Sequence, residues 1–399
     1  MKYDFDYVID RKNTNSLKYD FFEERGRSED LLPLWVADMD FRVPSEVTDA
    51  LIEKARHGIF GYSEPKKEYF DAVYDWFSRR HGWKPDTSKF VLSCGVVYAI
   101  CTLLQILTKE GDAVLIHQPV YYPFAESILS NDRKLVASEL VEKDGVYSID
   151  FEEFERAIVE NDVKVYILCN PHNPVGRSWT KEELTEIGKI CLSHGVFVIS
   201  DEIHGDFTYE GHPHTVFATL GDDFERNCVV CTAPTKTFNI AGLHIANIYI
   251  PDDRLREKYK RQLARQGYSQ SNVMGIVACQ AAYAHGEEWF LQLKEYLLGN
   301  LSFVREYLKT DLPEIKLVEP QGTYLLWLDC RALGLSDKQL SRFIRDDAKL
   351  WLDDGHIFGK GGSGFERVNM ACPRATLKEA LDRLLSAVNK IRNGGSLSQ

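Results

Sequence analysis

Short apolar runs alternate with longer segments of helical periodicity through the middle of the chain. The apolar runs are typical of buried β-strands and comprise Phe90–Ser93, Ala113–His117, Lys134–Leu140, Val163–Cys169, Val196–Ser200, Cys228–Cys231 and Ile245–Ile250. Helical spacing is found between them in Val96–Lys109 and Lys181–His194, and Thr180 with Glu183 forms a capping-box pattern before the second. Because apolar strands alternate with helices, we expect a mainly parallel sheet covered on both faces.

The pattern changes after Pro251. A helical stretch from about Glu287 to Lys309 precedes the strand-like segments Ile315–Val318, Tyr324–Leu328 and Arg367–Ala371, which predict a second, smaller α+β domain. We therefore expect four parts. They are an N-terminal arm belonging to the small domain (residues 1–48), a large α/β domain (49–285), a C-terminal small domain (286–392) and a disordered tail (393–399).

Composition and charge narrow the class of protein. The 399 residues include 44% hydrophobic side chains, enough for a large core, and the formal net charge is −12. An acidic chain without a basic run argues against nucleic acid or an anionic membrane surface as the main partner. Acids stand where a signal peptide needs an apolar stretch, and no apolar run approaches the ~18 residues of a membrane span. Nine cysteines, mostly in apolar segments, do not suggest a disulfide framework. We expect a cytosolic enzyme.

Lys236 is the first candidate for chemistry. It stands between the strand-like run Cys228–Cys231 and a run of small residues, without a charged neighbour for eight residues on either side. Desolvation lowers the pKa of a lysine and makes its amine a candidate nucleophile.

Three further segments place polar groups at the carboxyl ends of predicted strands, where open α/β sheets bind ligands. Asp201 ends one strand, although a helix cap is an equally good interpretation. The loop Asn170–Gly176 contains two Asn-Pro pairs, and an ordinary strand-exit turn is its alternative. Gly95 leads from a strand into a helix whose free amides could hold a phosphate. Together with Lys236, these groups predict a ligand site.

These segments resemble the signatures of a known family. Asn170-Pro-His-Asn-Pro-Val-Gly176, Asp201-Glu-Ile-His204 and Thr235-Lys-Thr-Phe-Asn-Ile-Ala-Gly-Leu243 are similar to those of the fold-type I enzymes that use pyridoxal 5′-phosphate (PLP). More narrowly, the chain resembles the MalY/PatB-type C–S lyases, cystathionine β-lyases built on an aminotransferase class I/II scaffold. The narrower likeness rests on Leu34–Phe41, Phe60–Ser63, Gly95–Val97, His204 and Arg367–Arg374. It implies an aspartate-aminotransferase-like large domain that binds PLP, plus a smaller α+β domain.

The resemblance also assigns roles to individual residues. Lys236 would bind PLP covalently and move the substrate's Cα proton, Asp201 would pair with the pyridine nitrogen, and Asn173 would donate to the ring's 3-oxygen. Tyr121 would stack on the ring and is a further catalytic candidate, although Tyr122 could take this place. The other expected cofactor contacts are the amides of Gly95, Val96 and Val97 at the phosphate, and His204, Thr235 and Tyr62.

The substrate and the subunit arrangement follow from the same likeness. Arg367 matches the arginine that grips the substrate α-carboxylate, where a planar two-donor group fits, and Arg374 is a second candidate. Tyr62 resembles a tyrosine that reaches the phosphate from a second subunit, which implies a homodimer. The Asn173–Pro174 peptide is a candidate for the cis form.

Two positions depart from the wider aminotransferase class. Aminotransferases place an arginine eight residues after the lysine, where this chain has His244, and Ser or Thr three residues before it, where this chain has Ala233. These departures favour the lyase. The implied reaction is α,β-elimination from L-cystathionine or L-cysteine-type substrates to a thiol, pyruvate and ammonia. The alternatives are a class I/II aminotransferase and a regulatory PLP-binding protein.

Other signals predict no further site. Cys228 and Cys231 lie three apart on a strand and should face opposite sides, which suits neither zinc nor a disulfide. The loop histidines (204, 212 and 214) are expected to be solvated rather than to bind a metal. The glycine-rich run 359–364 lacks the phosphate-loop pattern and predicts a tight bend before the strand of Arg367.

Overall fold

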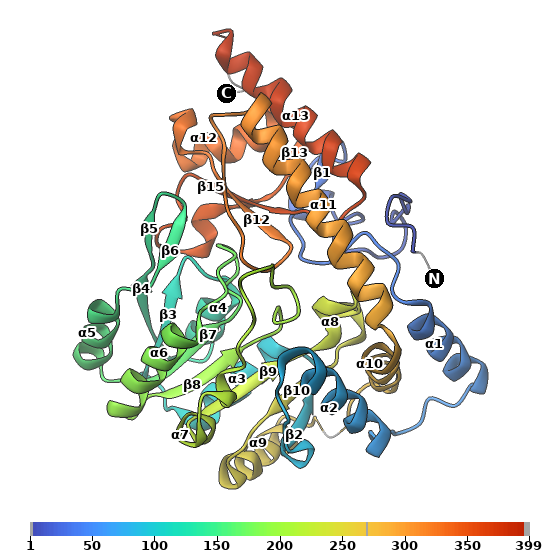
Figure 1. The fold of residues 1–399 in the computed structure, drawn as a ribbon, viewed down its shortest axis with the longest axis vertical. Coiled ribbons are helices and arrows are strands. Elements are labelled where there is room, and N and C mark those ends of the chain that lie inside the picture. The colour runs from blue at the N-terminus through green and yellow to red at the C-terminus, as the bar shows by residue number, and fades with distance from the viewer. Residues whose placement is uncertain (1–2, 269, 395–399) are drawn as a thin grey trace.

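The larger part of the chain is organised around one seven-stranded sheet (Figure 1). The computed structural model describes residues 3–268 and 270–394. The sheet order is β2-β10-β9-β8-β7-β3-β4. Its strands are β2 (Phe90–Ser93), β3 (Ala113–Gln118), β4 (Lys134–Glu139), β7 (Val163–Cys169), β8 (Phe197–Asp201), β9 (Cys228–Thr232) and β10 (Ala246–Tyr249). β10 runs antiparallel to β2 and β9 on either side of it, and all other adjacent strands are parallel, which confirms the predicted mainly parallel sheet.

Helices cover both faces of this sheet. One face packs against α3 (Val96–Leu107), α4 (Pro123–Leu129) and α9 (Asp253–Arg265). The other packs against α2 (Lys67–His81), α5 (Phe151–Asn161), α6 (Lys181–Ser193) and α10 (Val273–His285). Cys228 lies in the core on the side of α2, α5, α6 and α10, and Cys231 lies in the core on the side of α3, α4 and α9. The two thiols therefore face opposite sides of the sheet, as predicted.

The C-terminal part forms a smaller α+β layer (Figure 1, upper half). Its antiparallel sheet has the order β11 (Lys316–Val318), β12 (Leu325–Asp329), β15 (Phe365–Asn369) and β14 (Asp353–Asp354). It packs with α11 (Glu287–Asp311), α12 (Asp337–Arg342) and α13 (Arg374–Arg392). The N-terminal strand β1 (Leu32–Pro33) pairs in parallel with β13 (Leu350–Trp351), so both ends of the chain build this layer.

Local signals explain several element ends. Thr180 Oγ1 accepts from the Glu183 amide at 3.1 Å, and Glu183 Oε2 accepts from the Thr180 amide at 2.8 Å, so the capping box is confirmed. Positive φ angles at Gly359, Gly361 and Gly364 produce the expected bend before β15. Short or polar elements escaped the sequence pattern because they lack an apolar run: the hairpin β5 (Val141–Lys143) and β6 (Val146–Ser148), and helices α1 (Ser45–His57) and α7 (Asp222–Arg226).

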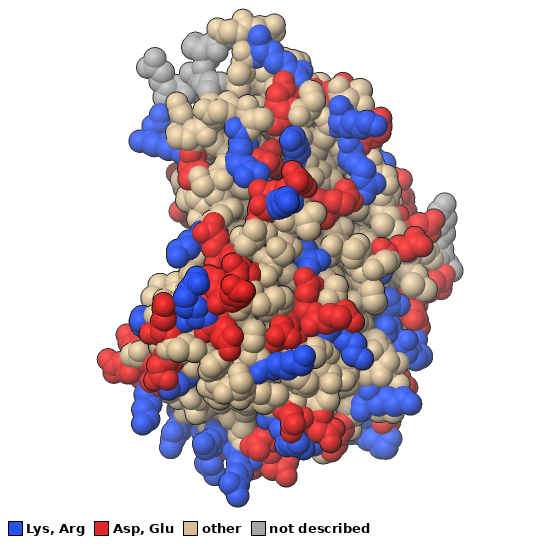
Figure 2. All heavy atoms as spheres, turned by 60° about the vertical axis from the view of Figure 1, so that its left-hand side comes forward, with Lys and Arg blue, Asp and Glu red and all other residues tan. Residues whose placement is uncertain are grey.

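Acidic and basic side chains are interspersed over the face shown in Figure 2, and acidic ones gather near its middle. Over the described part of the chain, no helix combines the length and apolar character required to cross a bilayer. No cluster of three or more metal-binding side chains is found within residues 3–268 and 270–394.

Candidate active site

Lys236 lies in the short helix α8 (Pro234–Thr237), which follows β9 directly. Its Nζ donates to the carbonyl of Ala37, 2.7 Å away and 199 residues distant in sequence. Burial lowers the pKa of this amine to about 8; the charges of Asp38 and Asp201 raise it and that of Arg367 lowers it. Because the pKa is close to neutral, a substantial fraction of the amine is unprotonated and nucleophilic at physiological pH.

Asp201 ends the neighbouring strand β8 and is buried. Its Oδ1 accepts from the amide of Ile203 at 3.1 Å, and it caps none of the described helices, so the cap interpretation does not hold. Burial raises the pKa of Asp201 to about 7, which the positive charge of Lys236 offsets only in part. A buried carboxylate without a hydrogen-bonded cation among the described residues is suited to a protonated ring nitrogen.

Asn173 connects the loop after β7 to the antiparallel sheet β11-β12-β15-β14. Its side-chain oxygen accepts from Arg367 Nη1 at 3.1 Å, and its backbone carbonyl accepts from the Tyr121 amide at 2.9 Å. The Asn173–Pro174 peptide is cis, as predicted. Burial raises the pKa of the Tyr121 hydroxyl, so this half-buried phenol stays protonated at neutral pH. The structure therefore brings Asn173, Tyr121 and Arg367 together.

Arg367 is almost fully buried in β15. Its Nη2 donates to the carbonyl of Trp35 at 2.8 Å and pairs with Asp353, a residue that the sequence did not single out. Its Nε has no partner within the described part of the chain. A buried guanidinium with an unused donor is well suited to receive a carboxylate.

The start of α3 leaves backbone amides free at the place where the sequence predicted a phosphate site. Gly95 is the residue before the helix, no side chain caps the first amides, and the space beside its Cα is open. The amides of Val96 and Val97 are therefore available to an oxyanion, which the helix dipole also favours. Thr235 is buried immediately before Lys236. His244 ends the 3-10 turn Ala241–Leu243 in the left-handed region, just before β10.

His204 lies in the loop after β8 and is buried. Its Nδ1 has no partner among the described residues, and its ring contacts that of Tyr324 with centroids 5.7 Å apart. Burial, with the nearby charges of Lys236 and Arg367, lowers the pKa of His204 well below its usual value, so the ring is neutral. The expectation of solvated loop histidines is wrong here and for His214, which is buried and bonded to Glu202 at 2.8 Å.

Asp206 binds the helix that carries Lys236, and the sequence analysis did not single it out. Its carboxylate accepts from Thr237 Oγ1 at 2.6 Å, from Trp76 Nε1 at 3.1 Å, and contacts His81 Nε2 at 2.9 Å. The only sequence signal was an acid shortly after Asp201 in the same loop. Asp206 therefore anchors α8, the helix that carries Lys236, to α2.

Two predicted site residues are not part of this group. Arg374 begins α13; its Nε donates to Asn300 Oδ1 at 2.6 Å and its guanidinium lies over Phe303, so its side chain serves the packing of α11 and α13. The prediction that it grips a substrate carboxylate is therefore not supported. Tyr62 is 93% exposed and lines a surface cavity of about 870 Å³ with Cys94 and His244.

Taken together, the strand ends offer a lysine, a carboxylate suited to a cationic nitrogen, and free helix amides suited to a phosphate. These donors fit PLP. Residues 29–384 match the model of the aminotransferase class I and II family. The chain belongs to this family. The fold-type I architecture expected from the sequence is thereby confirmed.

The chain is also similar to individual members of known function. It is 44% identical to cystathionine β-lyase PatB of Bacillus subtilis (strain 168) over 96% of this chain and all of that protein. Its structure superposes on cystalysin from Treponema denticola, which contains a PLP cofactor, with a TM-score of 0.94 and 37% identity over 98% of this chain and all of the other. The PLP-bound C–S lyase from Staphylococcus hominis gives 0.91 and 32% identity over 97% and 98%. The resemblance to MalY/PatB-type lyases is confirmed.

Proposed function

We propose that this protein is a PLP-dependent C–S β-lyase that cleaves L-cystathionine, L-cysteine or related S-substituted amino acids to a thiol, pyruvate and ammonia. The observation that carries the proposal is the convergence of Lys236, Asp201, Asn173 and Arg367 in a chain 44% identical to a cystathionine β-lyase.

The residues divide the work of binding and proton transfer. Lys236 would hold PLP covalently, Asp201 its ring nitrogen, Asn173 its 3-oxygen, and the amides at Gly95, Val96 and Val97 its phosphate. Bound PLP supplies the electron sink that allows a proton to leave the substrate's Cα. His204 and Thr235 would border the cofactor, and Tyr121 would stack against its ring.

Arg367 would bind the substrate α-carboxylate through its unpartnered Nε, while Asn173 holds Nη1 and Asp353 and the Trp35 carbonyl hold Nη2. The Lys236 amine, whose pKa burial lowers to about 8, is suited to accept the Cα proton at Nζ. Burial raises the pKa of Tyr121, so its phenol stays protonated and is suited to donate a hydrogen bond to the departing sulfur. Burial of these groups excludes water from the reacting carbon.

The aminotransferase alternative shares every residue role up to loss of the Cα proton. The experiment that separates the two adds L-cystathionine to the PLP-loaded protein without a keto acid. A lyase releases pyruvate and a thiol, which a coupled dehydrogenase and a thiol reagent measure. A strict requirement for a keto acid would establish an aminotransferase instead. PLP absorbance without turnover of any amino acid would favour the regulatory protein.

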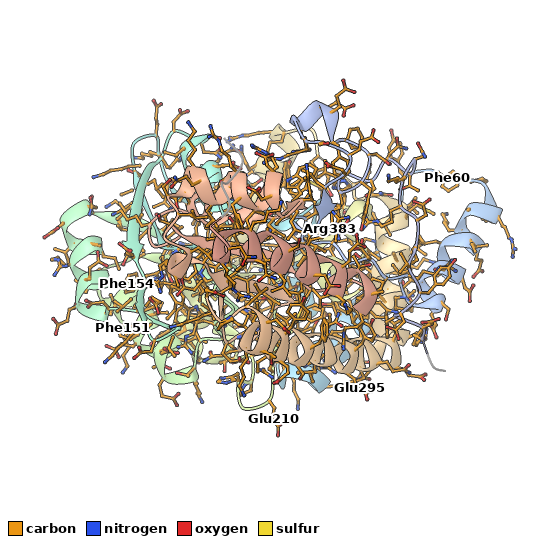
Figure 3. The ribbon with its side chains drawn as sticks, turned by 90° about the horizontal axis from the view of Figure 1, so that it is seen from above. Phe60, Phe151, Phe154, Glu210, Glu295 and Arg383 are labelled. Carbon is orange, nitrogen blue, oxygen red and sulfur yellow. The ribbon has the colours of Figure 1, made fainter. Side chains whose placement is uncertain are left out.

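We further propose a homodimer in which Tyr62 completes the site of a second copy. Support comes from the exposed apolar loop around it, where Ile59 is 66% and Phe60 58% exposed. Figure 3 places Phe60 at the outer edge of the molecule. Light scattering measures the mass. If sites are shared, mixing inactive Lys236→Ala and Tyr62→Ala chains restores turnover, because each mixed dimer has one intact site; the absence of restoration would count against sharing.

A further inference from the structure

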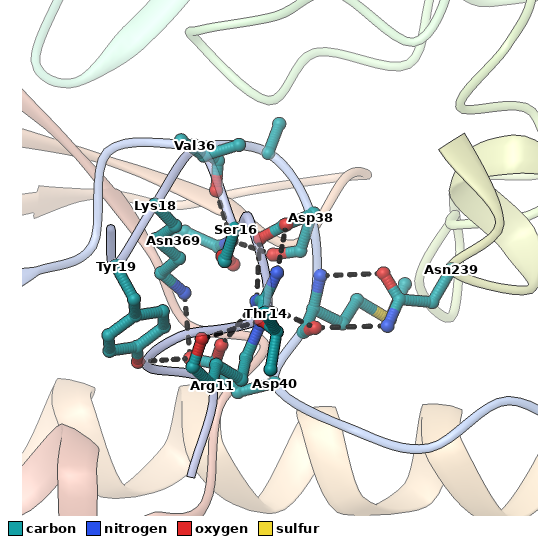
Figure 4. A network of polar contacts seen from close by, with 12 residues as sticks. Arg11, Thr14, Ser16, Lys18, Tyr19, Val36, Asp38, Asp40, Asn239 and Asn369 are labelled. Atoms are coloured by element: carbon teal, nitrogen blue, oxygen red, sulfur yellow. Dashed lines mark hydrogen bonds and ion pairs between the residues drawn. The ribbon is translucent and has the colours of Figure 1, made fainter. Parts of the chain in front are cut away.

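The N-terminal arm carries a charged cluster, drawn in Figure 4, whose members are separate from the residues of the active site. Arg11 Nη2 donates to Asp38 Oδ2 at 2.6 Å, and its Nη1 donates to Asp40 Oδ1 at 2.7 Å. Lys18, which is fully buried, donates to the other oxygen of Asp40 at 2.7 Å. The two cations thus neutralise the two carboxylates. Removing any one of these four side chains would leave a buried charge without its partner, which is strongly destabilising.

Residues 35–41, which include Asp38 and Asp40 of this cluster, are also held by side chains of other elements that bond to the backbone carbonyls of the segment. Asn369 donates to Val36 and Asp38, and Asn239 donates to Met39 and Phe41 (Figure 4). The segment is therefore a rigid row of acceptors with no regular secondary structure of its own.

Two carbonyls of the same segment reach the active site. Ala37 accepts from Lys236 Nζ at 2.7 Å and from the Tyr324 hydroxyl at 3.0 Å. Trp35 accepts from Arg367 Nη2 at 2.8 Å. Since Asp38 directly follows Ala37, the ion pair of Asp38 with Arg11 is one residue away from the acceptor of the lysine amine.

We propose that Arg11 is a positioning residue of the active site, which holds the Ala37 carbonyl against Lys236 and cancels the charge of Asp38 beside the lysine amine. The proposal rests on the proposed function only in taking Lys236 as the reacting lysine. Asp38 acts on the pKa of Lys236 in the upward direction, against burial. Without Arg11 that carboxylate is uncompensated and favours the protonated, unreactive amine.

The other charged and titratable groups near Lys236 stay unchanged when Arg11 is replaced. They are Asp201 and His204 from the end of β8 and its loop, Tyr121, Tyr324 and Arg367. Asp40, Lys18 and Tyr19 face the Arg11 pair from the arm itself. A shift in the pKa of Lys236 that is caused by the charge of Asp38 can therefore be recognised by replacing Asp38 together with Arg11.

The test measures the proton affinity of Lys236 directly in the full chain freed of cofactor. Limited acetylation at a series of pH values, followed by peptide mass spectrometry, gives the midpoint at which Lys236 becomes reactive. We expect Arg11→Met to move this midpoint to higher pH by roughly 0.5–1 unit, the size expected for a partly screened neighbouring charge. In the double variant R11M/D38N the midpoint returns towards that of the wild type.

Controls separate charge from folding. Arg11→Lys keeps the charge if Arg11→Met does not fold, and should retain the wild-type midpoint. Arg305→Met removes an exposed pair with Glu319 and should change nothing. An unchanged midpoint in R11M, or a shift that persists fully in R11M/D38N, would overturn the proposal. The labelling needs no turnover, so a failed pyruvate assay would contradict the proposed function and leave this result interpretable.

Discussion

Replacing Asp201 by Asn should stabilise the cofactor-free protein at neutral pH while weakening its hold on PLP. The buried carboxyl has no hydrogen-bonded cation among the described residues, and burial raises its pKa from 3.8 to about 7. An acid whose pKa is higher in the folded than in the unfolded state binds its proton more tightly when folded. Ionisation of Asp201 therefore costs stability, and an amide, which cannot ionise, avoids that cost.

The magnitude follows from the two pKa values. A difference of about three units corresponds to about 4 kcal/mol at 1.36 kcal/mol per unit. The amide keeps the acceptor for Ile203 but brings an N–H group without a partner, which costs about 1–3 kcal/mol. The net gain at pH 8 is about 2 kcal/mol. The contribution of the neutral carboxyl is fully present below pH 4 and is lost as the pH rises to 7, so the advantage of the variant grows over that window.

The assay is urea unfolding of both cofactor-free proteins between pH 4.5 and 8, repeated after loading with PLP. We expect the difference in free energy of unfolding to favour D201N increasingly with pH. Saturating PLP should reverse the order, because only the carboxylate can pair with a protonated ring nitrogen. A difference that does not change with pH, or a D201N variant that gains as much from PLP as the wild type, would refute the reasoning.

Four further substitutions test other parts of the structure. Glu366 is buried with both carboxylate oxygens unpartnered in the described chain, and burial raises its pKa well above the usual value. Glu366→Gln should therefore raise the free energy of unfolding by about 1–2 kcal/mol at pH 8. This gain in stability should disappear below the ordinary pKa of a glutamate. A variant less stable than the wild type at pH 8 would contradict the prediction. Arg367→Met should lower kcat/KM roughly 100-fold, because it removes a charge-assisted carboxylate contact of about 3 kcal/mol. Arg374→Met should leave kcat/KM unchanged and reduce only stability. Equal kinetic effects of the two substitutions would restore Arg374 as a candidate for binding the substrate carboxylate. Thr237→Val removes the 2.6 Å hydrogen bond to Asp206. The substitution should cost about 1.5–3 kcal/mol of stability, measured by thermal unfolding. An unchanged melting temperature would show that Asp206 does not anchor α8.

The strands of the large sheet and the groups at their ends could be predicted from the sequence. Apolar runs bounded by polar or turn-forming residues located β7 and β9 within a residue of their ends. Because parallel strands present their carboxyl ends at one edge, Asp201 and the lysine after β9 were expected at the same edge of the sheet, and the pairing of β8 with β9 brings them close. The isolated Lys236 already indicated a desolvated amine, and the structure supplies the cause.

Tertiary packing decided what surrounds that amine. The Ala37 carbonyl and the Asp206 carboxylate bond to α8, and the Arg11–Asp38 ion pair lies one residue from Ala37. None of these segments has a local pattern that points to α8. Arg374 stands in the same apparent motif as Arg367 yet contacts α11, because the chain turns into a helix between them. Hydrophobic periodicity is a property of residues that are neighbours in sequence. Burial and the partner of a charge depend instead on side chains that the fold brings together from hundreds of residues apart. The reactivity of the Lys236 amine is therefore set only once the fold has formed.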